Sequence, residues 1–200
     1  MPNIAVIYYS STGNVHQLAE ALAEGAREAG AEVRLRRVPE LAPQEAIDSN
    51  PLWRAHVDAT ADQVAEATPE DMGWADGYAL GSPTRFGTPA SQMKQFIDQL
   101  GGLWFTGKLA NKGATAFTSA QNVHGGNEST LLTFFNIFSH FGAVIVPPGY
   151  TDPLLFEAGG NPYGVSTASG GKSQTASEAE LTAARYQGRR LADITAKLVA

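Results

Sequence analysis

Residues 4–14 read Ile4-Ala5-Val6-Ile7-Tyr8-Tyr9-Ser10-Ser11-Thr12-Gly13-Asn14. The apolar run predicts a buried strand, and from Val15 onward apolar residues recur at helical spacing. A strand, a hydroxyl-rich turn and a helix therefore follow one another. The turn places hydroxyls and unpaired backbone N–H groups at a helix N-terminus, where the helix dipole favours an anion. The stretch predicts a phosphate cradle.

The kind of phosphate can be narrowed from what the turn lacks. No Lys follows Gly13, which argues against a nucleoside triphosphate site, and the turn has no Gly-x-Gly-x-x-Gly for a dinucleotide pyrophosphate. A monophosphate fits best. The same residue types also cap helices that bind nothing, so a purely structural turn stays open as an alternative at this point.

Length and composition limit the class of protein. With 200 residues and 43% hydrophobic content, the chain can bury one substantial core, so we expect a single domain over residues 1–200. No apolar run is long enough for a membrane helix, and no leader opens the chain. Together with the lack of Cys, this leads us to expect a cytoplasmic protein.

Charge and potential metal ligands exclude further classes. A net charge of −6 argues against binding to nucleic acid or to an anionic membrane, and Arg34, Arg36 and Arg37 are expected at a solvated strand edge. The four histidines show no ligand spacing, so no metal site is expected.

Strands and helices alternate along the chain, as in a parallel sheet covered on both faces. The predicted strands are residues 4–9, 32–37, 77–81, 114–119 and 143–146. The first helix should end near Gly30, another should start with Thr88 as N-cap and Pro89 as first residue, and others are expected over residues 128–141 and after a capping box at Ser177 and Glu180. Residues 38–75 read as an irregular excursion with short helical pieces, and residues 147–176 as a long loop, which is usually functional.

Five such strands favour a doubly wound α/β sheet of order 2-1-3-4-5, whose ligand lies outside the carboxyl ends of the strands. The loops 10–14, 82–87 and 120–127 should then converge. The second and third loops offer an aromatic, a cation and many amide donors. That combination suits a flat ring with a polar edge, such as an isoalloxazine.

The chain closely resembles the WrbA flavoproteins, which are FMN-dependent NAD(P)H:quinone oxidoreductases of flavodoxin-like fold. The resemblance spans nearly the whole length, and its specific stretches are residues 8–10, 81–87, 92–99, 101–104, 124–128 and 184–188. It implies FMN as cofactor, NADH or NADPH as electron donor, and two-electron reduction of quinones by ping-pong hydride transfer through the flavin. It also implies a homotetramer in which a neighbouring subunit completes each FMN site.

The resemblance assigns the cofactor to all three loops. The expected cofactor-binding residues are Ser10, Ser11, Thr12, Gly13, Asn14, Val15, Pro83, Thr84, Arg85, Phe86, Gly87, Ser119, Ala120, Gln121, Asn122, Gly125 and Gly126. The expected catalytic residues are Arg85, Trp104 and His140. Some members have Tyr in place of Thr12, and many have a second His where this chain has Phe141.

Two other readings stay open from the sequence. A flavodoxin-type single-electron carrier would share the fold, but the Trp104 segment, expected to be a protruding loop between glycines, and the greater length argue against it. A flavin-free phosphate-binding scaffold would purify as a colourless protein.

Overall fold

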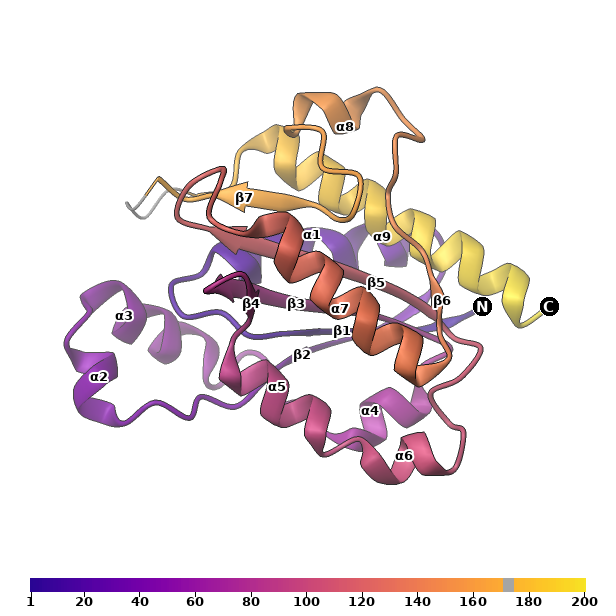
Figure 1. Ribbon diagram of the computed structural model, residues 1–200, viewed down its shortest axis with the longest axis horizontal. Coiled ribbons are helices and arrows are strands. Elements are labelled where there is room, and N and C mark those ends of the chain that lie inside the picture. The colour runs from indigo at the N-terminus through magenta and orange to yellow at the C-terminus, as the bar shows by residue number, and fades with distance from the viewer. Residues whose placement is uncertain (171–174) are drawn as a thin grey trace.

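The computed structural model describes residues 1–170 and 175–200 (Figure 1). Its strands are β1 (Asn3–Tyr8), β2 (Glu32–Arg37), β3 (Gly77–Arg85), β4 (Thr88–Pro89), β5 (Gly113–Ala120), β6 (Val144–Ile145) and β7 (Ser166–Ala168). Its helices are α1 (Asn14–Glu28), α2 (Gln44–Asp48), α3 (Pro51–Thr60), α4 (Pro69–Trp74), α5 (Ser91–Asp98), α6 (Gly101–Phe105), α7 (Asn127–Phe141), α8 (Leu154–Glu157) and α9 (Glu178–Leu198).

The main sheet runs in the order β2-β1-β3-β5-β6, and all of these neighbours pair in parallel. The predicted doubly wound order is therefore confirmed. Two short strands extend the predicted five: β4 pairs antiparallel with the end of β3, and β7 pairs in parallel with the end of β5. Both additions lie at the carboxyl ends of the strands, where the ligand of such a sheet binds.

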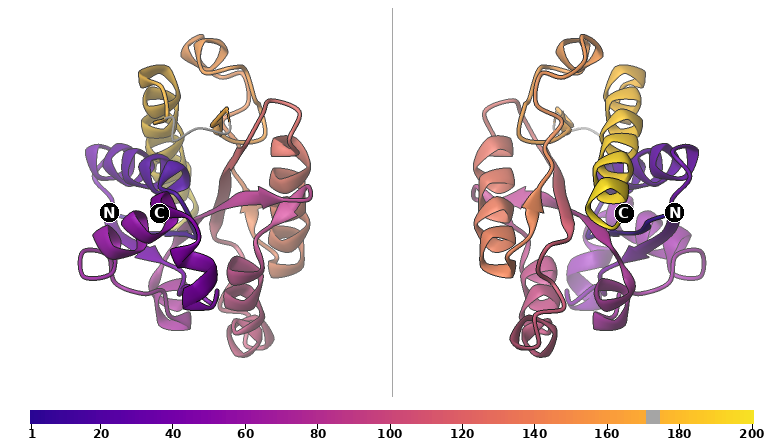
Figure 2. Two further views of the ribbon diagram at one scale, coloured as in Figure 1. Left: turned by 90° about the vertical axis from the view of Figure 1, so that its left-hand side faces the viewer. Right: turned by 90° about the vertical axis from the view of Figure 1, so that its right-hand side faces the viewer.

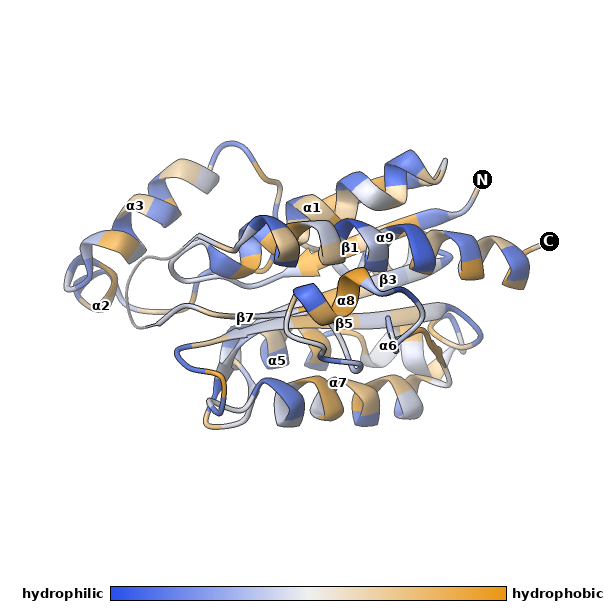
Figure 3. Cartoon of the chain, turned by 90° about the horizontal axis from the view of Figure 1, so that it is seen from above, coloured by the Kyte–Doolittle hydropathy of each residue, from blue (hydrophilic) through white to orange (hydrophobic). Residues whose placement is uncertain are grey.

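Helices cover both faces of the sheet (Figures 2 and 3). On one face α1 and α9 pack side by side, with Leu18 and Leu22 of α1 fully buried. On the other face lie α4, α5 and α7, which bury Met72, Phe96 and Phe134. Each helix presents one apolar stripe to the sheet, as its sequence period predicts.

Several predicted boundaries are confirmed. Strand β2 covers the predicted residues 32–37, and α1 ends at Glu28, two residues before Gly30. At α9, the Glu180 N–H donates to the Ser177 hydroxyl, and the Ser177 N–H donates to the Glu180 carboxylate, which is the predicted capping box.

The predicted helix start at Thr88 and Pro89 is wrong. Strand β3 continues past Gly81 to Arg85, the chain turns at residues 86 and 87, and Thr88 pairs with Arg85. Helix α5 begins only at Ser91, after the Ala90 N–H has donated to the buried Ser82 hydroxyl at 2.8 Å. Strand pairing has overridden a local helix signal.

The arginines of β2 are also not simply solvated. Arg34 and Arg36 both form ion pairs with Asp71, whose side chain is 5% exposed, and Arg37 pairs with Glu66. These contacts fasten β2 to the segment that follows it.

The short helical pieces predicted within residues 38–75 are confirmed as α2, α3 and α4. The predicted loop from residue 147 instead includes α8 and β7. Residues 171–174 of that predicted loop lie outside the described residues. Among the helices described, none is long and apolar enough to cross a membrane.

Candidate functional site

The first loop joins β1 to α1. The Tyr9 N–H donates to the Gly81 carbonyl at 2.9 Å, so β1 and β3 stay joined up to the point where the loop leaves the sheet. Gly13 is the N-cap of α1 with φ of 98°, and the first helical bond runs from the Gln17 N–H to the Gly13 carbonyl. The N–H groups of the first turn are thus left to bind an anion.

The second loop is a tight hairpin between β3 and β4. Phe86 and Gly87 both have positive φ, 52° and 80°. A positive φ is unusual for a bulky residue such as Phe86. The Phe86 side chain is also fully exposed. Beside it, Arg85 Nη2 donates to Ser11 Oγ at 3.2 Å, which ties the second loop to the first.

The third loop runs from β5 to α7. Gly126, with φ of 99°, is the N-cap of α7, and a Cβ placed on it would lie 2.9 Å from the Gly87 Cα. Thr130 Oγ1 donates to Thr84 Oγ1 at 2.8 Å. The second and third loops therefore touch backbone to backbone, and only glycine leaves the room for that approach.

The three loops enclose a cleft of about 540 Å³ at the carboxyl edge of the sheet. Its lining residues are Ser11, Thr12, Asn14, Asn50, Leu52, Pro83, Thr84, Arg85, Phe86, Ser119, Ala120, Gln121, Asn122, Gly125 and Ser169. The described lining contains one arginine and no carboxylate, although the whole chain has a net charge of −6. The cleft is therefore suited to an anionic, hydrogen-bonding ligand.

Most of the expected cofactor residues line this cleft. Those that do not are Ser10, Gly13, Val15, Gly87 and Gly126, which belong to the same three loops but do not form its wall. Asn50, Leu52 and Ser169 line it and were not expected. The Asn-Pro pair at residues 50–51 does signal a helix start, but no sequence signal says where that helix docks.

The carboxylate of Glu40 fixes the position of α3. It accepts hydrogen bonds from Tyr9 of the first loop region, from Trp53 Nε1 of α3 and from Gln92 of α5. Burial, the largest influence, would raise the pKa of Glu40, but the hydrogen bonds from the Ala42 backbone, Gln92, Tyr9 and Trp53 together bring it below its ordinary value. The ionised carboxylate thus holds three elements together beside the cleft.

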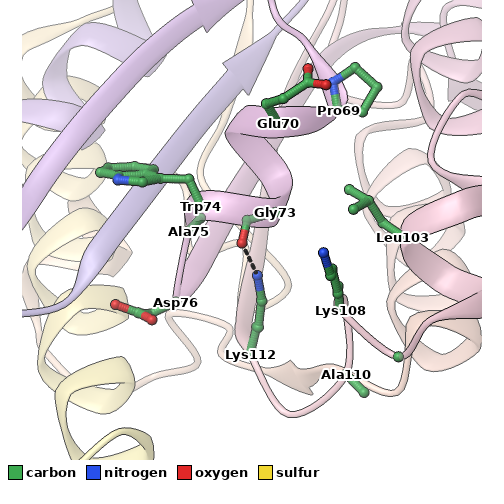
Figure 4. Close-up of a pocket in the computed structure, with 11 residues that line it drawn as sticks. Pro69, Glu70, Gly73, Trp74, Ala75, Asp76, Leu103, Lys108, Ala110 and Lys112 are labelled. Carbon is green, nitrogen blue, oxygen red and sulfur yellow. Dashed lines mark hydrogen bonds between the residues drawn. The ribbon is translucent and has the colours of Figure 1, made fainter.

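A larger cleft, of about 710 Å³, lies at the opposite, amino-terminal edge of the sheet (Figure 4). Two of its charged groups are used within the protein: Lys112 Nζ donates to the carbonyls of Met72 and Gly73 at the end of α4, and Asp76 accepts from the Asn3 N–H. Glu70 and Lys108 also line it. We place the functional site in the smaller cleft, because the three loops and the N-terminus of α1 converge there.

Trp104 and His140 are not in the cleft of their own chain. Trp104 belongs to the short helix α6 and not to the expected protruding loop, and its indole Nε1 donates to the His140 carbonyl at 2.9 Å. Helix α6 and the C-terminal end of α7, which carry these residues, lie at the end of the sheet away from α3 and β4 (Figure 1). Of the expected catalytic residues, only Arg85 lines the cleft.

Comparison with known proteins gives this arrangement a family. The sequence profile of the family described as NADPH-dependent FMN reductase matches residues 2–152. The chain belongs to this family. Two curated proteins named NAD(P)H dehydrogenase (quinone) are similar along almost their entire length: one from Deinococcus radiodurans is 52% identical and covers 98% of this chain and 96% of its own, and one from Rhizobium rhizogenes is 46% identical and covers 100% of both.

Solved structures share the fold of this FMN reductase family member. The WrbA-like flavodoxin from Agrobacterium tumefaciens has a TM-score of 0.69 at 23% identity, covering 98% of this chain and 99% of that chain. Oxidised Flavodoxin 1 from Bacillus cereus has a TM-score of 0.61 at 14% identity, covering 96% and 97%. These likenesses concern the fold alone.

The cleft of this FMN reductase family member has the donors that FMN requires. One helix N-terminus and the hydroxyls of Ser11 and Thr12 offer donors to which a single phosphate group could bind. Gln121 and Asn122 bring side-chain amides to the same lining, where a polar ring edge could hydrogen-bond. The residues present therefore fit an FMN-sized group.

Proposed function

We propose that this protein is an FMN-dependent NAD(P)H:quinone oxidoreductase whose FMN lies in the cleft between the three loops. The observation that carries the proposal is the convergence of an open helix N-terminus, Arg85 and a wall of amides on one carboxylate-free cleft. The family match and the naming of full-length relatives support the same reaction.

The first loop selects FMN over FAD. It offers one cradle, formed by the α1 N-terminus and the hydroxyls of Ser11 and Thr12, which suits one phosphate group. The cleft lining also includes the start of α3, but there the Asn50 side chain already accepts from the Leu52 and Trp53 N–H groups, so this helix start is not left open for a second phosphate.

The other two loops orient the ring system and control its electrostatics. When bound, FMN supplies the two-electron redox chemistry, and the protein supplies position and charge. Arg85 places a cation beside the cleft, and the amides of Gln121 and Asn122 donate from the third loop. A cation and N–H donors stabilise negative charge that develops on a bound group during reduction, and they do so best when they are already in position.

Trp104 and His140 complete the site from a neighbouring subunit of a homotetramer. Two observations support this proposal: both residues lie away from the cleft of their own chain, and Trp104 and Phe105 are 54% and 84% exposed on α6. Closed symmetry would bring this surface of one copy against the cleft of another. Donor and quinone would use the resulting cavity in turn, which gives ping-pong kinetics.

The visible spectrum of the purified protein tests the proposal. We expect FMN to bind in a 1:1 ratio, anaerobic NADH or NADPH to bleach it, and a benzoquinone to restore the oxidised spectrum. A protein that takes up FMN but is bleached only by a reduced partner protein would instead be a flavodoxin-type carrier. A protein that takes up no flavin would leave only the phosphate-binding scaffold.

A further inference from the structure

Two histidines from distant parts of the sequence lie together behind the first loop. The ring centroids of His16 on α1 and His56 on α3 are 5.4 Å apart. His56 Nδ1 lies 3.6 Å from the position that a Cβ on Gly13 would occupy. An imidazole nitrogen thus faces the N-cap of the helix that forms the phosphate cradle.

His16 is held between Tyr8 and Glu20. Burial raises the pKa of Tyr8, so its hydroxyl stays protonated, and this hydroxyl and His16 Nδ1 share a hydrogen bond of 2.6 Å. His16 Nε2 lies 3.4 Å from a Glu20 carboxylate oxygen. Burial lowers the pKa of His16 although Glu20 opposes this. Of the pair, His56 is the histidine whose ring nitrogen lies against the N-cap of α1.

His56 is neutral at pH 7 in the protein without ligand. Burial, the largest cause, and the charges of His16 and Arg37 together lower its pKa to about 4, and Glu40 acts in the opposite direction. These are the charged groups that face it from α1, from β2 and from the segment after β2; Tyr8 of β1 reaches it only through His16. None of them is a strong anion placed at the N-cap of α1, where a phosphate dianion would add one.

We propose that His56 supports the phosphate loop from behind and that a phosphate group in the cradle raises the pH at which His56 takes up a proton from the solvent. This inference rests on the FMN site proposed above. It makes His56 a positioning residue, because the imidazolium acts on the phosphate through the Gly13 backbone and not by direct contact.

The consequence is a link between FMN binding and proton uptake. A group that binds its proton more tightly in the complex than in the unliganded protein makes the ligand bind more tightly as the pH falls. The phosphate itself loses its second negative charge near pH 6, which weakens binding at low pH. A variant without the imidazole separates the two effects, because it retains only the second.

The direct test follows the His56 imidazole resonances by NMR during pH titrations of the wild-type protein alone, with FMN and with riboflavin, which lacks the phosphate. We expect FMN to raise the pKa of His56 by about one unit and riboflavin to leave it unchanged. Spectra of His56→Gln assign the signal. The same pKa in all three states, or an equal rise with riboflavin, would overturn the inference.

The second test measures FMN affinity by quenching of flavin fluorescence at pH 8 and pH 4.5. The ratio of wild-type to His56→Gln affinity should be close to one at pH 8 and rise to about threefold at pH 4.5. Asp58→Asn is the matched control, because it changes an exposed charge on α3 that pairs with Arg54, and it should follow the wild type.

The two proposals fail in different ways. If FMN does not bind at either pH, both the proposed function and this inference fall. If FMN binds and NADH bleaches it, but His56→Gln follows the wild type at both pH values, only the inference about His56 falls.

Discussion

The two edges of this parallel sheet use their polar groups differently. At the carboxyl edge, the first-turn N–H groups of α1, Arg85 and the amides of Gln121 and Asn122 face a cleft. At the amino-terminal edge, Lys112 is occupied by two carbonyls of α4. The second cleft is the larger, at about 710 Å³ against about 540 Å³. Volume is therefore a weaker guide to a site than polar groups that the fold leaves for a ligand.

The largest effect is expected from substitutions at the two ends of α1, since only its N-terminal end faces the cleft. Gly13 and Gly30 flank α1 and have φ of 98° and 86°, so a β-branched residue is strained at either position. Gly13→Val should weaken FMN binding on the order of tenfold to a hundredfold, the loss expected when donors to a charged group are displaced. Gly30→Val should lower the free energy of unfolding about as much as Gly13→Val does, because both residues have positive φ, but it should leave FMN affinity unchanged. Equal FMN affinity in the two variants would mean that the cradle is misplaced.

Trp104 tests whether the amino-terminal edge serves the cleft of another subunit. Trp104→Ala should lower quinone turnover by about tenfold, since a stacking surface is lost, while FMN affinity changes by less than about twofold. Steady-state kinetics and FMN titration measure the two effects, and light scattering records the assembly. Full turnover in a protein that stays monomeric would rule out the shared site.

Backbone contact between the second and third loops can be measured as stability. At Gly126 an added Cβ would lie 2.9 Å from the Gly87 Cα, whereas at Gly107, near the amino-terminal edge, it would meet nothing within 4 Å. Both residues have positive φ. Gly126→Ala should therefore cost about 2–3 kcal/mol in urea unfolding and Gly107→Ala about 1 kcal/mol. Similar costs would show that the loops do not depend on close approach.

The smallest expected effect is a pH dependence of stability at the cleft edge. The folded-state pKa of His56, about 4, lies below the ordinary value of 6.5, so the unfolded chain binds more protons between these values. Stability without ligand should therefore fall as the pH drops from about 6.5 to about 4. After allowance for solvent screening the loss is about 1 kcal/mol. Unfolding at pH 7 and pH 5 should show a smaller loss for His56→Gln than for the wild type.

The sequence was most informative where local and long-range signals agree. The run from Ile4 to Asn14 predicted β1, the loop and the start of α1. It did so because an apolar run of this length favours a buried strand, and a turn rich in hydroxyls favours a helix start, in most tertiary surroundings. The alternation of strands and helices predicted the strand order, because parallel strands need crossover connections of one hand. The loop residues from Ser10 to Gly126 were named from the sequence, and most of them line one cleft.

At two points, contacts between distant segments decided what the local sequence could not predict: where α5 begins, and where α3 packs. Thr88 and Pro89 carry a helix-start signal, but pairing with the end of β3 moved the start to Ser91. Asn50 and Leu52 reach the cleft because Trp53 of the same helix donates a hydrogen bond to the Glu40 carboxylate. A single hydrogen bond between two distant side chains leaves no periodic pattern in the sequence from which it could be predicted.

The sequence by itself determined the fold class, the strand order and the strand–turn–helix unit that we propose as the phosphate loop, because each follows from periodicity and turn chemistry within a short stretch of chain. Only the tertiary structure decided that His56 lies behind Gly13, that α3 forms one wall of the cleft and that Trp104 lies at the opposite edge from it. Those placements depend on side-chain packing and buried hydrogen bonds between segments distant in sequence, and their energies exist only once the chain has folded.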